Sequence, residues 1–411
     1  MVRFIHSADL HLGRSLKASS NMTDPFIYMA SQATYHSFEK LVTVAISKKV
    51  DFFLVSGDIY DEEQRSIKGQ WFFRKQALRL QKESIPLYII HGNHDPLVYK
   101  DNLISMPENV HIFSSKVSSM FLKTEAKEEV YIYGFSYPQV AYMENPVPLY
   151  QKERNNEAYH IGMLHGQESG QLGHDPYAPF TVSSLLEKEF DYWALGHVHK
   201  REVLTDNPPV VYPGNVQGCH RKESGPKGAY LVEITKKETS LSFIETAPIA
   251  WMEIRVSING LLTVDELIDE VGERIQALED TRAYILSLVI DGKGKLHKLL
   301  GNSEKRKELF ELLIEEYSTN DMSIEKLLIQ TKSIIDKERW RNQEHLIGDI
   351  IRTNEALTAD NSEVKERLAT LYDHRHIRNY LEHLSDKEQQ KLAEEAENIL
   401  LTTLIGEEEA L

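Results

Sequence analysis

Seven side chains that can bind metal ions follow short apolar runs at five separate places along the chain. They are Asp9, His11, Asp58, Asn93, His165, His197 and His199. Carboxylate oxygens and imidazole nitrogens in one site suit Mn²⁺, Fe²⁺ or Zn²⁺, whereas Mg²⁺ and Ca²⁺ prefer oxygen ligands throughout. Seven ligands are too many for one ion, so the set predicts two divalent ions that share one carboxylate.

The spacing within two of these places strengthens the prediction. Asp9 and His11 are two residues apart, and so are His197 and His199. In an extended chain, residues i and i+2 project to the same face. We therefore expect each pair to direct two groups toward one point.

The surrounding sequence predicts an α/β domain that brings these places together. Up to about residue 250, apolar runs such as VRFIHS, DFFLVSGD and IPLYIIHG alternate with helical patterns around 35–49 and 67–83. In open α/β sheets, sites form where the carboxyl ends of strands meet, and the seven side chains follow such runs. EVYIYGF, AYHIGMLH, FDYWALGH and PVVYPG add strands, and AYLVEI and SLSFIET flank TKKET like the arms of a hairpin. So many strands predict two facing sheets with outer helices, a four-layer α/β/β/α sandwich.

The pattern changes after this domain. From about residue 251, the strand-like runs WMEIRVSI, AYILSLVI and SIEKLLIQ alternate with helical patterns over 263–279 and 303–317, which predicts a small α+β unit. Beyond residue 332 helix-forming residues dominate, and Ser385 and Glu388 form a capping box that begins a last helix. We therefore predict a domain over 1–250, an α+β domain over 251–331 and a helical region over 332–411.

The composition is that of a globular protein and narrows its setting. No window approaches eighteen uninterrupted apolar residues, and the amino terminus lacks the apolar core of a signal peptide, so we expect no membrane span and a cytoplasmic location. Cys219 is the only cysteine, which excludes a disulfide framework within one chain. The formal charge of −16 argues against a surface that binds nucleic acid throughout, although bound cations would reverse the sign locally.

The order and spacing of the motifs resemble the calcineurin-like metallophosphoesterase superfamily. The motifs are D-x-H at 9–11, G-D at 57–58, G-N-H-D at 92–95, H-G at 165–166 and G-H-x-H at 196–199. The runs IHSADLHLGR, SGDIYD and YPGNVQG are similar to the DNA-repair nucleases of the SbcD and Mre type. HDPYAPF and FDYWALGHVHK resemble more narrowly the bacterial YhaO subgroup. The resemblance covers the first 250 residues well and the remainder only in general plan.

This resemblance implies how the ligands divide between two metal ions. The first ion would be held by Asp9, His11 and His199. The second would be held by Asn93, His165 and His197. The carboxylate shared by both ions would then be that of Asp58.

The resemblance also implies roles for residues that do not bind metal. His94 would lie beside the scissile phosphate and stabilise charge on the leaving oxygen, and Asp95 would orient it. Asp61 occupies a position where some of these nucleases carry a histidine, while SbcD-like sequences carry an acid. The resemblance therefore does not imply how the substrate strands are held near that loop.

The activity that the resemblance implies is hydrolysis of DNA. The chain would be a dinuclear, Mn²⁺-dependent exonuclease or endonuclease that acts in DNA repair with a coiled-coil ATPase of the SMC/Rad type. In such relatives the α+β unit is a cap, the following helices dock on the ATPase, and nuclease domains pair as a homodimer. Two alternatives stay open: a small-molecule phosphodiesterase or phosphatase of the same fold, and a non-catalytic scaffold for the ATPase. The helical region could equally pack onto the chain's own domain.

Other polar residues near these motifs have simpler interpretations. His6 and His111 fit structural histidines beside strands. His174 lacks a preceding apolar strand, which favours a loop role. Three basic residues could contact phosphate, but a charged loop explains them as well: Arg14, Arg221 and Lys222.

Overall fold

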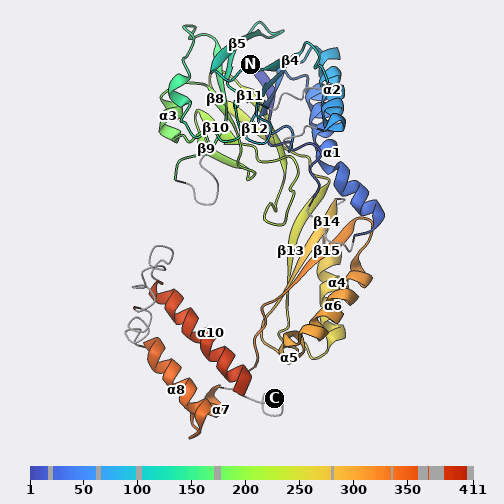
Figure 1. Ribbon diagram of the computed structural model, residues 1–411, viewed down its shortest axis with the longest axis vertical. Coiled ribbons are helices and arrows are strands. Elements are labelled where there is room, and N and C mark those ends of the chain that lie inside the picture. Colours follow the sequence, from blue (N-terminus) through green and yellow to red (C-terminus); the bar gives the residue numbers. More distant parts are fainter. Residues whose placement is uncertain are drawn as a thin grey trace. The chain divides into compact units, whose positions relative to one another are not determined.

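The chain divides into two compact units (Figure 1). The computed structural model describes residues 1–16, 22–61, 66–98, 104–170, 177–278, 282–334, 337–359, 369 and 384–404. The first unit comprises Met1–Met252, Asp280–Ser287 and Tyr317–Glu325. The second comprises Glu253–Glu279, Leu288–Glu316 and Lys326–Leu411.

The first large sheet supplies three of the strand ends that carry predicted ligands. Its strand order is β12-β11-β1-β2-β3-β4. These strands are β1 (Val2–Ser7), β2 (Phe52–Ser56), β3 (Leu87–Ile90), β4 (Val110–Ile112), β11 (Gly228–Ile234) and β12 (Thr239–Glu245). Strands β1 to β4 are parallel, and β11 pairs antiparallel with β1 and with β12, which confirms the predicted hairpin. The run FFLVS of β2 is buried throughout, as expected for a parallel strand covered on both faces.

The second large sheet supplies the other two strand ends. Its strand order is β5-β6-β7-β8-β10-β9. These strands are β5 (Ser118–Lys123), β6 (Glu129–Gly134), β7 (Tyr159–His165), β8 (Tyr192–Gly196), β9 (Glu202–Asp206) and β10 (Pro209–Tyr212). The four inner strands are parallel, and β5 and β9 pair antiparallel at the two edges.

The two sheets face each other across an apolar core. Phe4 of β1 stacks on Phe52 of β2 with ring centroids 4.8 Å apart, and it meets the edge of Tyr192 from the second sheet at 5.3 Å. Such close-packed aromatic pairs contribute about 0.5–1.5 kcal/mol beyond the area that they bury. The core therefore fixes the two sheets relative to each other and, with them, the loops at their ends.

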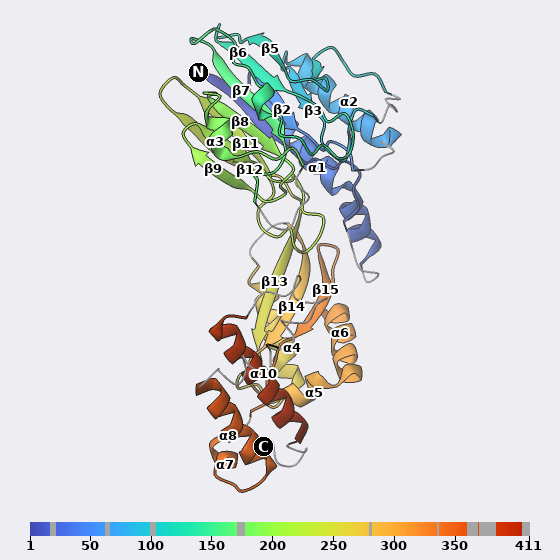
Figure 2. The same ribbon diagram turned by 60° about the vertical axis from the view of Figure 1, so that its left-hand side comes forward.

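Helices cover the outer faces of both sheets (Figure 2). Helices α1 (Asp24–Lys48) and α2 (Ile67–Lys82) pack on the first sheet. Thr23 caps α1 by accepting a hydrogen bond from the Phe26 N–H, and Ser66 caps α2 in the same way. Helix α3 (Val182–Leu186) and the 3₁₀ turn η1 (Val147–Leu149) cover the second sheet. This arrangement confirms the predicted α/β/β/α sandwich.

A three-stranded sheet with helices follows, as predicted for the α+β unit. Its strand order is β13-β14-β15. The elements are β13 (Ile249–Ser257), α4 (Val264–Gln276), β14 (Ala283–Asp291), α5 (His297–Gly301), α6 (Ser303–Tyr317) and β15 (Met322–Ile329). Thr263 and Glu266 form a capping box at the start of α4, because each side chain accepts from the backbone N–H of the other residue.

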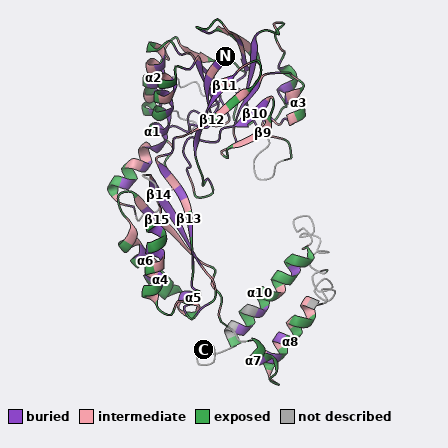
Figure 3. Ribbon diagram, turned by 180° about the vertical axis from the view of Figure 1, so that it is seen from behind, coloured by how far each residue is buried: buried purple, intermediate pink, exposed green. Residues whose placement is uncertain are grey.

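Helices form the described part of the last region. They are α7 (Lys337–Arg341), α8 (Leu346–Ala359) and α10 (Asp386–Leu404). Trp340, Ile351 and Leu401 form a small apolar cluster among them. Ser385 and Glu388 make the predicted capping box at the start of α10. Figure 3 shows exposed residues along α8 and α10 beside a few buried ones.

None of the described helices combines the length and the apolar character that crossing a bilayer requires.

Candidate active site

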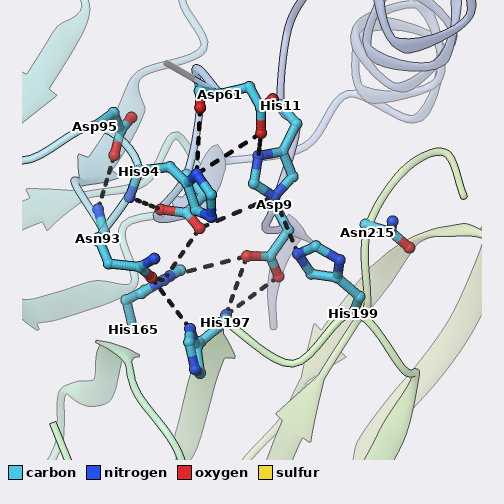
Figure 4. Close-up of polar contacts among 12 residues, drawn as sticks. Asp9, His11, Asp61, Asn93, His94, Asp95, His165, His197, His199 and Asn215 are labelled. Carbon is cyan, nitrogen blue, oxygen red and sulfur yellow. Dashed lines mark hydrogen bonds and ion pairs between the residues drawn. The ribbon is translucent and has the colours of Figure 1, made fainter. Parts of the chain in front are cut away.

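Five loops from the two sheets meet at one edge of the sandwich. The predicted ligands follow β1, β2 and β3 of the first sheet and lie at or after the ends of β7 and β8 of the second. Neighbouring loops are joined directly, since the Asp9 N–H donates to the Gly57 carbonyl oxygen at 3.1 Å and the His11 N–H donates to the Asp58 carbonyl oxygen at 3.0 Å. The His197 N–H donates to the Asp9 carboxylate at 3.1 Å, which links the two sheets. The structure thus brings all seven predicted ligand side chains into one cluster (Figure 4).

The backbone that carries them is not the extended chain assumed from the spacing. Asp9, His11 and Asp58 have φ values of 51°, 44° and 52°, and His197 has a φ of 95°. These values lie in the left-handed region, which is uncommon for residues with a side chain and is often found at functional sites. Asp9 and His11 therefore converge through tight turns after β1, and the alternation of an extended strand does not explain their direction.

Asp9, His11 and His199 form the first predicted ligand group. One ligand atom from each lies within 4.8 Å of the others. The Nε2 atoms of His11 and His199 are 3.0 Å apart. Two imidazole nitrogens that face each other at this distance in a buried site suit a cation bound between them and the Asp9 carboxylate.

Asn93 lies at the centre of the second predicted ligand group. Its Oδ1 atom lies 3.1 Å from Nε2 of His165 and 3.2 Å from Nδ1 of His197. Asp58 lies between the two groups, because its Oδ2 atom is 3.4 Å from His165 Nε2 and 3.9 Å from His11 Nε2. The donor set and its arrangement fit two divalent ions that share Asp58.

Two glycines leave the space that this cluster needs. A Cβ at Gly92 would lie 2.3 Å from Oδ1 of Asp58 and 2.5 Å from Nε2 of His165. A Cβ at Gly57 would lie 2.1 Å from Nδ1 of the same His165, and Gly57 has a φ of 94°. Any other residue at either position would displace a predicted ligand.

The buried charges of the cluster depend on each other. Burial raises the pKa of Asp9. Burial would also raise the pKa of Asp58, but the facing His165 outweighs it and holds the pKa of Asp58 well below its usual range. Burial would lower the pKa of His165, but attraction to Asp58 raises it to about 9. His165 therefore carries a proton at neutral pH in the metal-free protein, and a bound cation would displace that proton.

His94 and Asp95 occupy different surroundings. The His94 side chain is 38% exposed, its Nδ1 atom lies 3.2 Å from the carbonyl oxygen of Asp61, and its N–H donates to Asp58 Oδ1 at 3.0 Å. Asp95 is fully buried and accepts hydrogen bonds from the backbone N–H groups of Ile59 and Gly92 at 2.9 and 2.8 Å. Asp95 thus fixes the loop that presents His94, while its predicted role in orienting the His94 ring stays a prediction.

Sequence reasoning missed a carboxylate that contacts the cluster. Glu223 Oε1 lies 2.6 Å from Nδ1 of His199. Its other oxygen accepts from the Cys219 N–H at 2.6 Å and from Nδ2 of Asn215 at 3.1 Å. Burial would lower the pKa of His199, but the hydrogen bond to Glu223 raises it. Glu223 follows no apolar strand and lies in the charged run RKES, so no pattern in the sequence marked it.

Asp61 also contacts the cluster. Its Oδ1 atom lies 3.0 Å from Nδ1 of His11 and 3.1 Å from Nη1 of Arg14. The guanidinium of Arg14 therefore faces a carboxylate, and its predicted alternatives, a phosphate contact or a charged loop, stay open.

The remaining residues singled out in the sequence lie outside the ligand cluster. His6 is buried, and its two ring nitrogens lie 2.9 Å from Tyr192 Oη and 3.0 Å from the Leu195 carbonyl oxygen, as expected for a structural histidine. His111 stacks on Tyr88. His174 lies outside the described residues.

A cavity of about 690 Å³ opens beside the cluster. Asp58, His94, His197 and His199 line one part of it. Basic residues line another part: Lys200, Arg201, Lys222 and Lys227. The cavity therefore joins the predicted metal ligands to a positively charged wall, in a chain whose net charge is strongly negative.

Known proteins resemble this chain over most of its length. Residues 2–201 match the family model described as calcineurin-like phosphoesterase, and residues 251–332 match the model for the middle domain of the metallophosphoesterase YhaO. The metallophosphoesterase YhaO of Bacillus subtilis is 35% identical to this chain over 97% of this chain and 96% of its own length.

More distant relatives carry the name DNA double-strand break repair protein Mre11. The protein from Methanocaldococcus jannaschii is 26% identical over 65% of this chain and 72% of its own. The protein from Saccharolobus solfataricus is 27% identical over 73% of this chain and 78% of its own. Together with the full-length similarity to YhaO and the cluster of aspartate and histidine ligands, these matches identify the family of this chain. It belongs to the calcineurin-like phosphoesterase family of hydrolases.

Proposed function

We propose that this chain is a two-metal phosphodiesterase that hydrolyses DNA with Mn²⁺, for which Fe²⁺ or Zn²⁺ are the alternatives. The observation that carries the proposal is the cluster in which five loops place Asp58 between two groups of ligands beside a basic cavity. Mixed oxygen and nitrogen ligands favour these three ions over Mg²⁺ and Ca²⁺. The proposed site residues are the seven ligands together with His94 and Asp95.

Different residues of the chain would have different roles in hydrolysis. When bound, the ions would polarise the phosphoryl oxygens and lower the pKa of a coordinated water. His94 would stabilise charge on the leaving oxygen: its Nδ1 faces the carbonyl oxygen of Asp61, so Nε2 is left toward the substrate and would donate to it when both ring nitrogens carry protons. Asp95 would hold the loop through its bonds to Ile59 and Gly92, so that His94 keeps this position.

The basic wall of the cavity supports a polyanionic substrate. Lys200, Arg201 and Lys222 are exposed along it and would contact phosphates on either side of the bond to be cleaved. A phosphomonoester offers one phosphate and would leave most of this wall unused. The names of the Mre11 relatives point to DNA as the polyanion. DNA as the substrate also agrees with the cytoplasmic location expected from the sequence.

The direct test is cleavage of end-labelled oligonucleotides, single-stranded and double-stranded, by the pure protein with Mn²⁺ and with EDTA. We expect Mn²⁺-dependent cleavage and none in EDTA. Cyclic nucleotides and phosphomonoesters are assayed beside them. Faster turnover of these small substrates would replace the proposal with the small-molecule phosphodiesterase, and no Mn²⁺-dependent hydrolysis at all would replace it with the non-catalytic scaffold.

We further propose that the α+β domain over 251–331 caps the nuclease domain over 1–250 and that the helices over 332–411 dock on a coiled-coil ATPase of the SMC/Rad type. The described helices α8 and α10 leave several large apolar side chains exposed: Leu346, Leu392, Ile399, Leu400 and Leu404. An apolar helix face of this kind fits a groove on a partner. Co-purification with such an ATPase from the same genome, and its loss on Ile399→Asp, would test the docking.

A homodimer that forms through the helices of the nuclease domain completes the proposal. Tyr28 of α1 and Trp71 of α2 are large and exposed. Aromatic side chains of this kind are enriched in the cores of interfaces. Light scattering after size exclusion should give the mass of two chains for the wild type and of one chain for a Tyr28→Glu, Trp71→Glu variant; one chain for the wild type would exclude the dimer.

A further inference from the structure

Two carboxylates outside the predicted ligand set contact the imidazoles of one ligand group. Asp61 Oδ1 lies 3.0 Å from Nδ1 of His11, and Glu223 Oε1 lies 2.6 Å from Nδ1 of His199. The Nε2 atoms of these two histidines face each other at 3.0 Å. In each ring, Nδ1 thus contacts a carboxylate and Nε2 points toward the other ring. Figure 4 shows the contact between Asp61 and His11.

Such contacts determine which ring nitrogen can bind a cation. A carboxylate that accepts from Nδ1–H fixes the proton on that nitrogen and leaves the lone pair on Nε2. It also makes the ring a stronger electron donor toward the cation. The hydrogen bond to Glu223 therefore holds His199 in the tautomer that binding through Nε2 requires, and the Asp61 carboxylate, 3.0 Å from Nδ1 of His11, favours the same tautomer of His11 by charge attraction.

Both carboxylates are themselves held in place. Glu223 is only 8% exposed, and its second oxygen accepts from the Cys219 N–H and from Asn215. Asp61 pairs with Arg14 at 3.1 Å. Because these partners fix the carboxylates before any cation arrives, little ordering is left to occur on binding.

The second ligand group is supported differently. Nδ1 of His165 lies 2.9 Å from the backbone carbonyl oxygen of Ser56, a neutral acceptor. His197 directs Nδ1 toward Asn93 Oδ1 at 3.2 Å. This ring would therefore bind an ion through Nδ1, whereas His11 and His199 would bind through Nε2. A neutral acceptor increases the donor strength of an imidazole less than a carboxylate does.

We propose that Asp61 and Glu223 are positioning residues that make the site of Asp9, His11 and His199 the tighter of the two metal sites. This inference rests on the proposed two-metal function. It predicts that Mn²⁺ fills this site first and the site of Asn93, His165 and His197 second.

The test is a titration of the full chain with Mn²⁺ in the absence of substrate. The electron paramagnetic resonance signal of free Mn²⁺ measures how much Mn²⁺ has bound. The wild type should show one tight and one weaker site. Asn93→Ala should lose the weaker site and keep the tight one. In that background, Glu223→Gln and Asp61→Asn should each weaken the remaining site by about 10- to 100-fold, the usual cost of losing such a partner.

A matched control and a second position keep this test sharp. Asp191 accepts a hydrogen bond from the His160 backbone N–H and does not contact the ligand cluster, so Asp191→Asn should leave both affinities unchanged. Thermal melting of the metal-free variants checks that each folds, and Asp61→Asn carries the test if Glu223→Gln does not fold. Equal affinities in the wild type would overturn the inference. Loss of the tight site in Asn93→Ala, or no weakening of the remaining site by Glu223→Gln and Asp61→Asn, would also overturn it.

These experiments can refute the proposed binding order and the proposed function independently. Two unequal Mn²⁺ sites with the expected variant effects but no cleavage of any phosphodiester would refute the proposed function and leave the binding order standing. Mn²⁺-dependent cleavage of DNA with unchanged affinities in the variants would refute the inference alone.

Discussion

Oδ2 of Asp58, in the loop after β2, lies 3.4 Å from Nε2 of His165, at the end of β7. The two strands belong to different sheets, so this contact joins the halves of the sandwich at the point where the ligands meet. Attraction to Asp58 raises the pKa of His165 to about 9, so this ring is protonated at neutral pH in the metal-free protein. Binding of a divalent cation would release that proton and put two positive charges in place of one beside Asp58.

The stability of the metal-free protein should fall as the pH rises toward 9. The pKa of His165 is about 9 in the folded protein and 6.5 in the reference state. Its contribution to folding is complete below pH 6.5 and is lost as the pH rises through 9. Urea unfolding in EDTA at pH 6, 7.5 and 9 measures this loss. The difference in stability between the wild type and His165→Gln should shrink over this range, and a constant or growing difference would contradict the proposed pairing.

Asp58→Asn should abolish hydrolysis because it removes the carboxylate charge that both ions would share. Mn²⁺ bound per chain should fall from two to one or none, and activity should fall to the level measured in EDTA. Elemental analysis and an oligonucleotide cleavage assay provide the two measurements, and Asp191→Asn serves as the matched carboxylate control. A variant that keeps two ions and full activity would remove Asp58 from the bridging role.

His94→Ala should separate turnover from metal binding. His94 is half-exposed beside the cavity and makes its contacts with Asp58 and Asp61 through its backbone N–H and Nδ1. Loss of a proton donor usually costs about 10²- to 10⁴-fold in turnover. We expect this loss in kcat with two Mn²⁺ ions still bound. If elemental analysis instead found ions missing, His94 would be a ligand or a structural residue.

Lys222→Ala should weaken the binding of oligonucleotides more than the hydrolysis of a small diester. Lys222 is exposed on the basic wall of the cavity, so it would neutralise a phosphate away from the scissile bond. The slope of log affinity against log salt concentration should decrease by about one. Lys82 is exposed at the end of α2 and outside the cavity lining, so Lys82→Ala is the matched control for Lys222→Ala. An unchanged slope would show that DNA does not follow this wall.

Gly92→Ala should impair the metal site through sterics alone. The added Cβ would lie 2.3 Å from Asp58 Oδ1 and 2.5 Å from His165 Nε2, so both ligands must move. Overpacking of this kind usually costs about 1–3 kcal/mol of stability. Gly301→Ala, where a Cβ meets no atom within 4 Å, should change neither Mn²⁺ affinity nor stability. Normal Mn²⁺ affinity in Gly92→Ala would show that the ligands need not be packed this closely.

The sequence predicted the layers and the ligand cluster because both depend on patterns that are local in the chain. Buried parallel strands need apolar runs, and polar residues such as Asn93 and His165 mark where such runs end. The direction of Asp9 and His11 was argued incorrectly from strand alternation, which ceases to hold once the chain turns with positive φ. Their meeting was predicted correctly, but for a reason that the backbone does not support.

The contact between Glu223 and His199 could not be predicted from pattern. It depends on how the loop around Cys219 folds back on the end of β8, and that fold is set by non-local bonds such as the one between Trp251 Nε1 and the Gly218 carbonyl oxygen. Asp61 was noticed only as a departure from relatives, and its contact with His11 emerged from the structure.

Anomalous scattering from a crystal of this protein soaked in Mn²⁺ would show whether two ions bind among the seven predicted ligands. We expect two peaks about 4 Å apart, one among Asp9, His11 and His199 and one among Asn93, His165 and His197, with Asp58 touching both. A single peak, or peaks away from these side chains, would contradict it.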